Sequence, residues 1–138
     1  MTRNLIVLGC AGLLAIGLSF GTFAGSVPDV DSDGVPDQYD NCDVVPNGPL
    51  SGSCSGQEDA DQDGYGTACD GDLNNNLLVG VEDLGDILIA LGGTDPEADF
   101  NCNTLVGVED LGDLLVWLGG VPGSSGLACA GTVPCYAQ

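Results

Sequence analysis

Two short segments of the chain share one apolar pattern. In each, large aliphatic residues recur with the spacing i, i+3, i+4, i+7, which places them on one face of an α-helix. The residues of these two stripes are Leu84, Ile87, Leu88 and Leu91, and then Leu111, Leu114, Leu115 and Leu118. The pattern therefore predicts two short amphipathic helices.

Pairs of glycines follow both stripes, at Gly92-Gly93 and Gly119-Gly120. Glycine just past a helical pattern is a stop signal, so both helices are predicted to end there. Neither helix could bury its stripe alone, and we expect the two to pack antiparallel on each other. Trp117 is expected in or beside that small core, with a binding role as the alternative.

A nine-residue sequence occurs twice, from Leu78 to Asp86 and from Leu105 to Asp113, and oxygen-bearing side chains precede each copy. Together they form two 12-residue segments, 72–83 and 99–110, with side-chain oxygens at positions 1, 3, 5 and 12. This spacing suits Ca²⁺, a hard cation with six or more oxygen ligands. A duplicated unit of this kind predicts two calcium loops, each followed by a helix.

Two more segments, 29–40 and 59–70, carry the same donor spacing with carboxylates alone. Both also have glycine at position 6, Gly34 and Gly64, where a calcium loop turns sharply. The alternative for such an acidic stretch is a disordered linker. The donor spacing and glycine placement favour calcium, so we expect about four sites.

The predicted ligands comprise these side chains and the position-7 residues of the four loops. They are Asp29, Asp31, Asp33, Val35, Asp37, Asp40, Asp59, Asp61, Asp63, Tyr65, Asp70, Asp72, Asn74, Asn76, Leu78, Asp83, Asp99, Asn101, Asn103, Leu105 and Asp110.

The four loops are not expected to be equivalent. Loops 72–83 and 99–110 have two carboxylates each, and Leu77 and Thr104 stand where the other loops have glycine. A non-glycine residue in the left-handed region costs about 1–2 kcal/mol, unless the turn passes through Asn75 or a neighbour. Because fewer charges and a strained turn both lower affinity, we predict two tight sites and two weaker ones.

Charge narrows the possible functions. The 138 residues include 21 Asp and Glu, one cationic residue (Arg3) and no His. Carboxylate repulsion can therefore be relieved only by protons or bound cations. Nucleic-acid binding is excluded because phosphate contacts need Lys or Arg. Catalysis by His or Lys is excluded too, so we do not expect an enzyme.

The first residues predict export. Residues 1–24 combine Arg3, an apolar run from Leu5 to Phe20, and Thr22-Phe-Ala24, which fits a secretory cleavage site. A membrane anchor and lipidation at Cys10 are the alternatives. After cleavage, six of the seven cysteines would remain. In a small secreted chain they indicate disulfides with 15 possible pairings, and the lack of His and of a CxxC pair argues against zinc.

Residues 29–70, with Asp40-Asn-Cys42 and Ala68-Cys69-Asp70, resemble a thrombospondin type 3 repeat. The resemblance implies backbone wrapped around calcium with almost no hydrophobic core. It also implies a small insert closed by a Cys42–Cys54 disulfide. Residues 72–120 resemble a type I dockerin domain, which is built from two calcium loops each followed by a helix.

The predicted fold class is a small, mostly irregular protein stabilised by calcium loops. Duplicated EF-hand-like loop–helix units, mainly α, follow a core-poor calcium-wrapped repeat. The predicted divisions are a signal peptide (1–24), a thrombospondin type 3-like repeat (25–70), a dockerin-like domain (71–120) and a tail (121–138) closed by a Cys129–Cys135 disulfide.

The dockerin resemblance implies a secreted or cell-surface binding module for a cohesin-type partner, linked to polysaccharide degradation. The matching partner-binding positions are Val81, Glu82, Leu88, Ile89, Val108, Glu109, Leu115 and Val116. One alternative is a calcium-rigidified spacer or self-assembling matrix or adhesion protein. A calcium buffer or sensor is a further alternative. No nucleic acid is expected, nor any membrane contact beyond a transient signal peptide.

Overall fold

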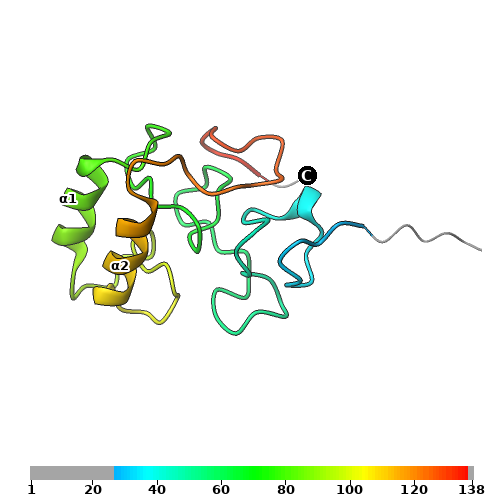
Figure 1. Cartoon of the computed structure of the whole chain (residues 1–138), viewed down its shortest axis with the longest axis horizontal. Helices are drawn as coiled ribbons and strands as arrows, with labels where there is room; N and C mark the ends of the chain where they lie inside the picture. The colour runs from blue at the N-terminus through cyan, green and yellow to red at the C-terminus, as the bar shows by residue number, and fades with distance from the viewer. Residues whose placement is uncertain (1–26, 137–138) are drawn as a thin grey trace, which may run out of the picture.

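The computed structural model describes residues 27–136. The signal peptide predicted for residues 1–24 lies outside this range. Within it are a single-turn 3₁₀ helix η1 (Asp37–Tyr39) and two α-helices, α1 (Val81–Ala90) and α2 (Val108–Trp117), and no β-strand. Figure 1 shows α1 and α2 together at one end of the molecule and irregular backbone over the rest. No helix in residues 27–136 has the length and apolar character needed to cross a membrane.

Both helices begin directly after a glycine and are capped by the aspartate three residues beyond that glycine. The carboxylate of Asp83 accepts the main-chain N–H of Gly80 at 2.6 Å, and Asp110 accepts that of Gly107 at 2.7 Å. An acidic side chain in the first helical turn satisfies a free N–H group and favours the helix dipole. Both helices end as predicted, before Gly92 and Gly119, whose φ angles are +80° and +87°.

Main-chain hydrogen bonds join the two loop–helix units reciprocally. Val106, just before α2, exchanges hydrogen bonds of 2.8 and 3.0 Å with Gly92 and Gly93 after α1. Val79, just before α1, exchanges bonds of 2.7 and 3.0 Å with Gly119 and Gly120 after α2. Each helix therefore ends beside the start of the other, so the helices are antiparallel, as the apolar stripes predicted.

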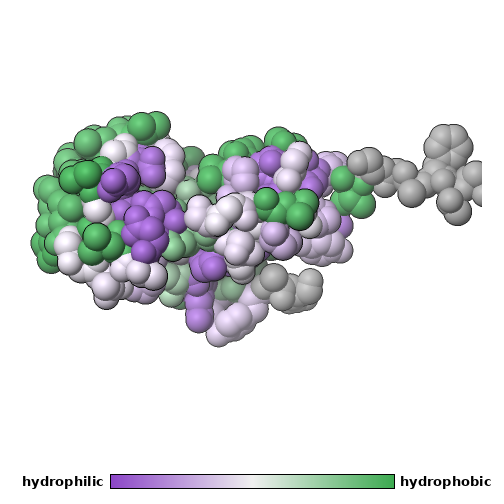
Figure 2. All heavy atoms as spheres, turned by 90° about the horizontal axis from the view of Figure 1, so that it is seen from below, coloured by the Kyte–Doolittle hydropathy of each residue, from purple (hydrophilic) through white to green (hydrophobic). Residues whose placement is uncertain are grey.

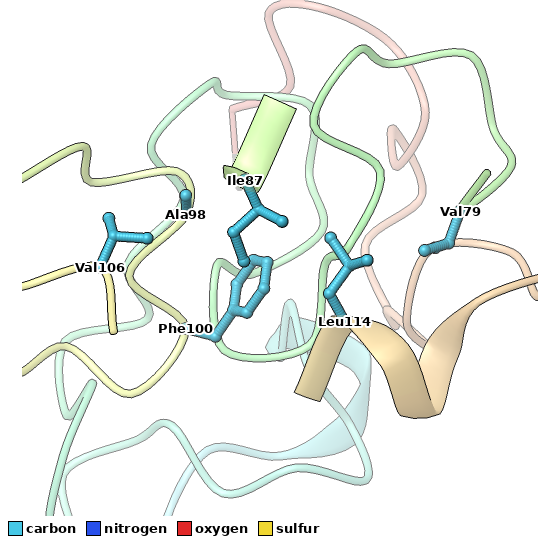
Figure 3. Close-up of a cluster of buried hydrophobic side chains, with 6 residues drawn as sticks. All are labelled: Val79, Ile87, Ala98, Phe100, Val106 and Leu114. Carbon is cyan, nitrogen blue, oxygen red and sulfur yellow. The ribbon is translucent and has the colours of Figure 1, made fainter. Parts of the chain in front are cut away.

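The core between the helices takes only part of each stripe. Its buried residues are Val79, Ile87, Ala98, Phe100, Val106 and Leu114 (Figure 3). Leu88, Leu115 and Leu118 are exposed instead, because loop residues fill the space that the stripes were expected to occupy. Trp117 packs at the edge of this core, with its ring 5.1 Å from that of Phe100 in an edge-on arrangement.

Three disulfides cross-link the part of the chain that the structure describes, and they correct one prediction. Cys42 pairs with Cys69 rather than with Cys54, which pairs with Cys102. The reason is local: Gly66 donates its N–H to the carbonyl of Asn41 at 2.9 Å, which brings Cys69 beside Cys42. The third disulfide, Cys129–Cys135, closes the tail as predicted.

Candidate calcium sites

The four loops share one backbone shape. Position 4 of every loop has a left-handed φ of +54° to +65°, at Ser32, Gln62, Asn75 and Cys102. Position 6 is left-handed in every loop as well, with φ of +95° and +92° at Gly34 and Gly64, +69° at Leu77 and +74° at Thr104. The turn in loops 72–83 and 99–110 therefore does not avoid position 6. These non-glycine residues, above all the β-branched Thr104, adopt a conformation that is strained for them.

One hydrogen bond recurs in all four loops. The carboxylate at position 1 accepts the N–H of position 6, with distances of 3.3 Å for Asp29, 3.0 Å for Asp59, 2.5 Å for Asp72 and 2.7 Å for Asp99. Each loop thus curls its main chain around its own first aspartate.

Loops 29–40 and 59–70 each gather three carboxylates. Carboxylate oxygens of Asp29, Asp31 and Asp33 lie within 4.8 Å of one another, and those of Asp59, Asp61 and Asp63 do the same. One carboxylate oxygen each of Asp31, Asp40 and Asp63 is buried and accepts no hydrogen bond within the part of the chain that the structure describes. Buried oxygens without partners are costly, and no cationic side chain exists in residues 27–136 to pair with them.

Burial and mutual repulsion act on the protonation of these carboxyls. Burial, followed by the charges of neighbouring aspartates, raises the pKa of Asp31 and Asp63 to about 6 and that of Asp70 to about 8. Burial also raises the pKa of Asp40 and Asp59. Without a bound cation, protonation of these carboxyls is the least costly way to reduce their mutual repulsion. The donor set, carboxylate oxygens with a main-chain carbonyl at position 7, fits Ca²⁺.

The structure separates two predicted ligands from these groups of three. The carboxylate of Asp37, at position 9, accepts the N–H of Val30 at 2.8 Å. Thr67, at position 9 of loop 59–70, does the same for Ala60 at 3.3 Å. Position 9 therefore braces the loop. Asp40, at position 12, accepts the amide N–H of Gln57 at 2.8 Å.

Loops 72–83 and 99–110 are closed differently. The fully buried carboxylates at position 12, Asp83 and Asp110, accept both the main-chain N–H and the amide N–H of Asn74 and Asn101, respectively, at 2.8–3.2 Å. Both carboxylates also cap their helices. Internal donors thus satisfy these aspartates, and each asparagine presents its nitrogen, rather than its oxygen, to position 12.

Position-5 and position-7 residues complete the description of these loops. Both position-5 asparagines donate their main-chain N–H to the first aspartate of the loop, Asn76 to Asp72 at 3.1 Å and Asn103 to Asp99 at 3.0 Å. The side chain of Asn103 also accepts the N–H of Leu105 at 2.9 Å. The side chains of Leu78 and Leu105 are exposed, so only their carbonyls are suited to ligation.

Sequence reasoning missed a buried polar network beside loop 29–40. Asn47 donates its N–H to Asp33 at 2.9 Å, and Asn41 donates its amide N–H to the carbonyl of Gln57 at 3.0 Å. Asn41 and Asn47 are buried although both are polar. The insert that supplies Asn47 and Gln57 has no apolar periodicity, so no sequence signal marked them.

The tail was also missed as part of the sites. Its main chain crosses both carboxylate-rich loops, and Gly126 donates to the carbonyl of Asp40 at 2.9 Å. Gly131 donates to the carbonyl of Asp63 at 2.8 Å, and Cys135 to that of Gln62 at 2.7 Å. A Cβ on Gly126 would lie 1.6 Å from the carbonyl oxygen of Asp37, so glycine is needed for this approach. The tail therefore straps the two loops together.

Part of the chain is similar in sequence to known proteins. The chain is 43% identical over 67 residues to mouse thrombospondin-3 and 43% identical over 61 residues to bovine thrombospondin-4. Part of the chain is a thrombospondin type 3 repeat-like segment. The matches cover 40% and 37% of this chain but 6% of each relative, so the similarity concerns one segment of much longer proteins.

The comparisons give no support to the dockerin resemblance of residues 72–120. No protein-family model matches the chain. No solved structure matches it either.

Proposed function

We propose that this protein is a secreted calcium-binding module of the extracellular-matrix type, in which calcium rigidifies residues 27–70 into a spacer. The observation that carries the proposal is the set of buried carboxylate oxygens without partners in loops 29–40 and 59–70. The similarity to thrombospondins favours the spacer over the cohesin-binding function that the dockerin resemblance implies. Three disulfides are typical of an oxidising, extracellular compartment.

In this proposal the loops hold the ion with oxygen atoms alone. Asp29, Asp31 and Asp33 would ligate calcium in the first loop, and Asp59, Asp61 and Asp63 in the second, with the carbonyls of Val35 and Tyr65. A bound cation supplies positive charge where the chain has none. Its binding free energy is then coupled to the folding of residues that have almost no apolar core.

Calorimetric titration of the purified protein with calcium tests the proposal. We expect a tight class of sites from loops 29–40 and 59–70 and a weaker class from the other two loops. Asp31→Asn and Asp63→Asn together should weaken the tight class by an order of magnitude or more, since affinity depends on the number of ligand charges.

Asp86→Asn and Asp113→Asn form the matched control. These residues are exposed aspartates on the helices, outside the four loops, and the pair removes the same charge. The control variant should keep the affinity of the tight class. The proposal fails if the unmodified protein binds no calcium, or if both double variants lose affinity equally.

A second candidate function, attachment to a protein partner, is favoured by the surface of the helices. All eight predicted partner positions are exposed, including Ile89 at 85% and Val116 at 81%. Figure 2 shows hydrophobic residues gathered at the end of the molecule that carries α1 and α2. Isolated exposed apolar residues are ordinary, whereas a gathered patch is typical of an interaction surface.

Sedimentation velocity in calcium over a range of protein concentrations tests self-association, and a panel of cohesin modules tests the dockerin-like alternative. Ile89→Ser with Val116→Ser should abolish whichever binding is observed. Val30→Ser with Val44→Ser, at exposed valines remote from the helices, is the matched control. A monomer that captures no cohesin would contradict this candidate.

A further inference from the structure

A small cavity lies where the thrombospondin-like segment meets the loop–helix units. Its volume is about 10 Å³, which is close to the space that one water molecule needs. Four carboxylate residues line it: Asp61, Asp70, Asp72 and Glu97. Asp61 and Asp70 belong to loop 59–70, Asp72 begins the next loop, and Glu97 comes from the segment between the helices.

Glu97 is far from this loop in sequence, yet it lines the same cavity as the loop's Asp61 and Asp70. Burial, and then the charges of Asp61, Asp95 and Asp63, raise the pKa of Glu97. Its own N–H is braced by the carboxylate of Asp95 at 3.2 Å, which fixes the backbone of the segment. No hydrogen bond to the Glu97 carboxylate occurs within residues 27–136, and the chain has no Lys or Arg in this range.

An independent observation marks the same loop as a cation site. Asp63 is 1% exposed, and one of its oxygens is buried without a hydrogen-bond partner. Asp70 is also buried, and it lines the cavity. Four carboxylate residues thus line a space the size of one water molecule, and the unpartnered oxygen of Asp63 belongs to the same loop. Their repulsion is relieved if a divalent cation occupies that space.

We propose that Glu97 adds a carboxylate to the coordination sphere of the calcium ion held by loop 59–70. The inference rests on the proposed function, because it assumes that this loop binds calcium. It goes further because the site would then take ligands from two parts of the chain, loop 59–70 and the segment between α1 and α2. The ion would link the segment between α1 and α2 to the thrombospondin-like segment, in addition to the covalent Cys54–Cys102 disulfide.

NMR titration of the full protein with calcium tests the proposal through Glu97→Gln. The amide signal of Gly64, whose N–H is bonded to Asp59, reports on loop 59–70, and that of Gly34 reports on loop 29–40. We expect calcium affinity measured at Gly64 to fall about tenfold, or about 1.4 kcal/mol. Affinity measured at Gly34 should not change. Calcium should also protect the amide of Ala98 from exchange in the unmodified protein and less in the variant.

Asp86→Asn is the matched control, because it removes one charge from the exposed surface of α1 and Asp86 does not line the cavity. It should leave the affinity at Gly64 within about twofold, or about 0.4 kcal/mol. Equal affinity in Glu97→Gln and the unmodified protein would overturn the inference, as would an equal loss in both variants. If the unmodified protein shows no calcium response at Gly64, the proposed function itself fails.

Discussion

Residues 27–70 and residues 72–120 build the same 12-residue loop twice each and close it by different means. In the first region, buried carboxylates keep oxygens without partners, and the only apolar cluster is built largely from cysteines. In the second region, asparagine amides and helix N-terminal N–H groups satisfy the buried aspartates, and an apolar core stands behind them.

The comparison teaches that backbone shape alone does not fix a loop's dependence on metal. All four loops place positions 4 and 6 in the left-handed region and wrap position 6 onto the first aspartate. What differs is the number of charges enclosed and the number of internal donors that meet them. We therefore expect the stability of the first region to depend on a bound cation more than that of the second.

The largest expected effect is on the apolar core of the second region. Leu114→Ala, at a fully buried position, should lower the free energy of unfolding by about 2–5 kcal/mol. Leu115→Ala is the matched control on the same helix, since Leu115 is exposed, and should cost well under half as much. Thermal unfolding followed by circular dichroism measures both. Equal losses would show that the helices have no specific core.

Acidification should change the stability of the first region in opposite directions with and without calcium. In calcium-free buffer the raised pKa values of Asp31, Asp63 and Asp70 mean that protonation stabilises the fold. This stability is present below the unfolded pKa, near 3.9, and is lost as pH rises through about 6 and then about 8. Order in residues 27–70 should therefore increase from pH 8 to pH 5.

In saturating calcium, acidification should instead destabilise residues 27–70, because protons compete with the ion for the same oxygens. The melting temperature should then decrease over the same range. Near-ultraviolet circular dichroism at a series of pH values follows both conditions. Parallel pH profiles with and without calcium would refute the assignment of these carboxylates to an ion site.

Removing a carboxylate from a loop of the first region and adding one to a loop of the second should shift their calcium affinities in opposite directions. Asp63 and Asn76 occupy position 5 of their loops. Asp63→Asn should weaken calcium binding at loop 59–70 about tenfold, or about 1.4 kcal/mol, and Asn76→Asp should tighten it at loop 72–83 by a similar factor. Calorimetry on the two variants gives the result. Calcium affinities that do not move in opposite directions would show that charge count is not what distinguishes the loops.

The smallest effect concerns the turn. Leu77→Gly should relieve the left-handed strain at position 6 and stabilise loop 72–83 by up to about 1–2 kcal/mol. The flexibility of glycine in the unfolded chain opposes part of this gain. Leu78→Gly, at the next position, is the matched control without that benefit. Weaker calcium binding in Leu77→Gly would show that Leu77 has a packing role.

Much of the second region could be predicted from sequence, because both helices and their ends follow from apolar spacing and glycine pairs. The core could not be predicted fully. Val79 and Val106 belong to segments recognised for their oxygen donors, and Phe100 lies between two such donors, yet these three residues displace Leu88 and Leu115 from the interior. Helical periodicity identifies a face but not which of its residues a loop will cover.

Less of the first region could be predicted, beyond its donor spacing. The Cys42–Cys69 pairing and the tail both depend on main-chain hydrogen bonds, such as that from Gly123 to Cys69 at 3.1 Å. Such bonds leave no pattern of side chains in the sequence. Glu97 was missed for a related reason, since only the folded structure brings it to the cavity beside Asp61.

Amide hydrogen exchange with and without calcium tests the central claim most directly. In chelator at neutral pH, the N–H groups of Gly34 and Gly64 should exchange nearly as fast as in an unfolded chain. Those of Val79 and Val106, which join the helical units, should remain protected. Calcium should then protect all four. Equal protection of the two pairs in chelator, or earlier loss at Val79 and Val106, would contradict the account.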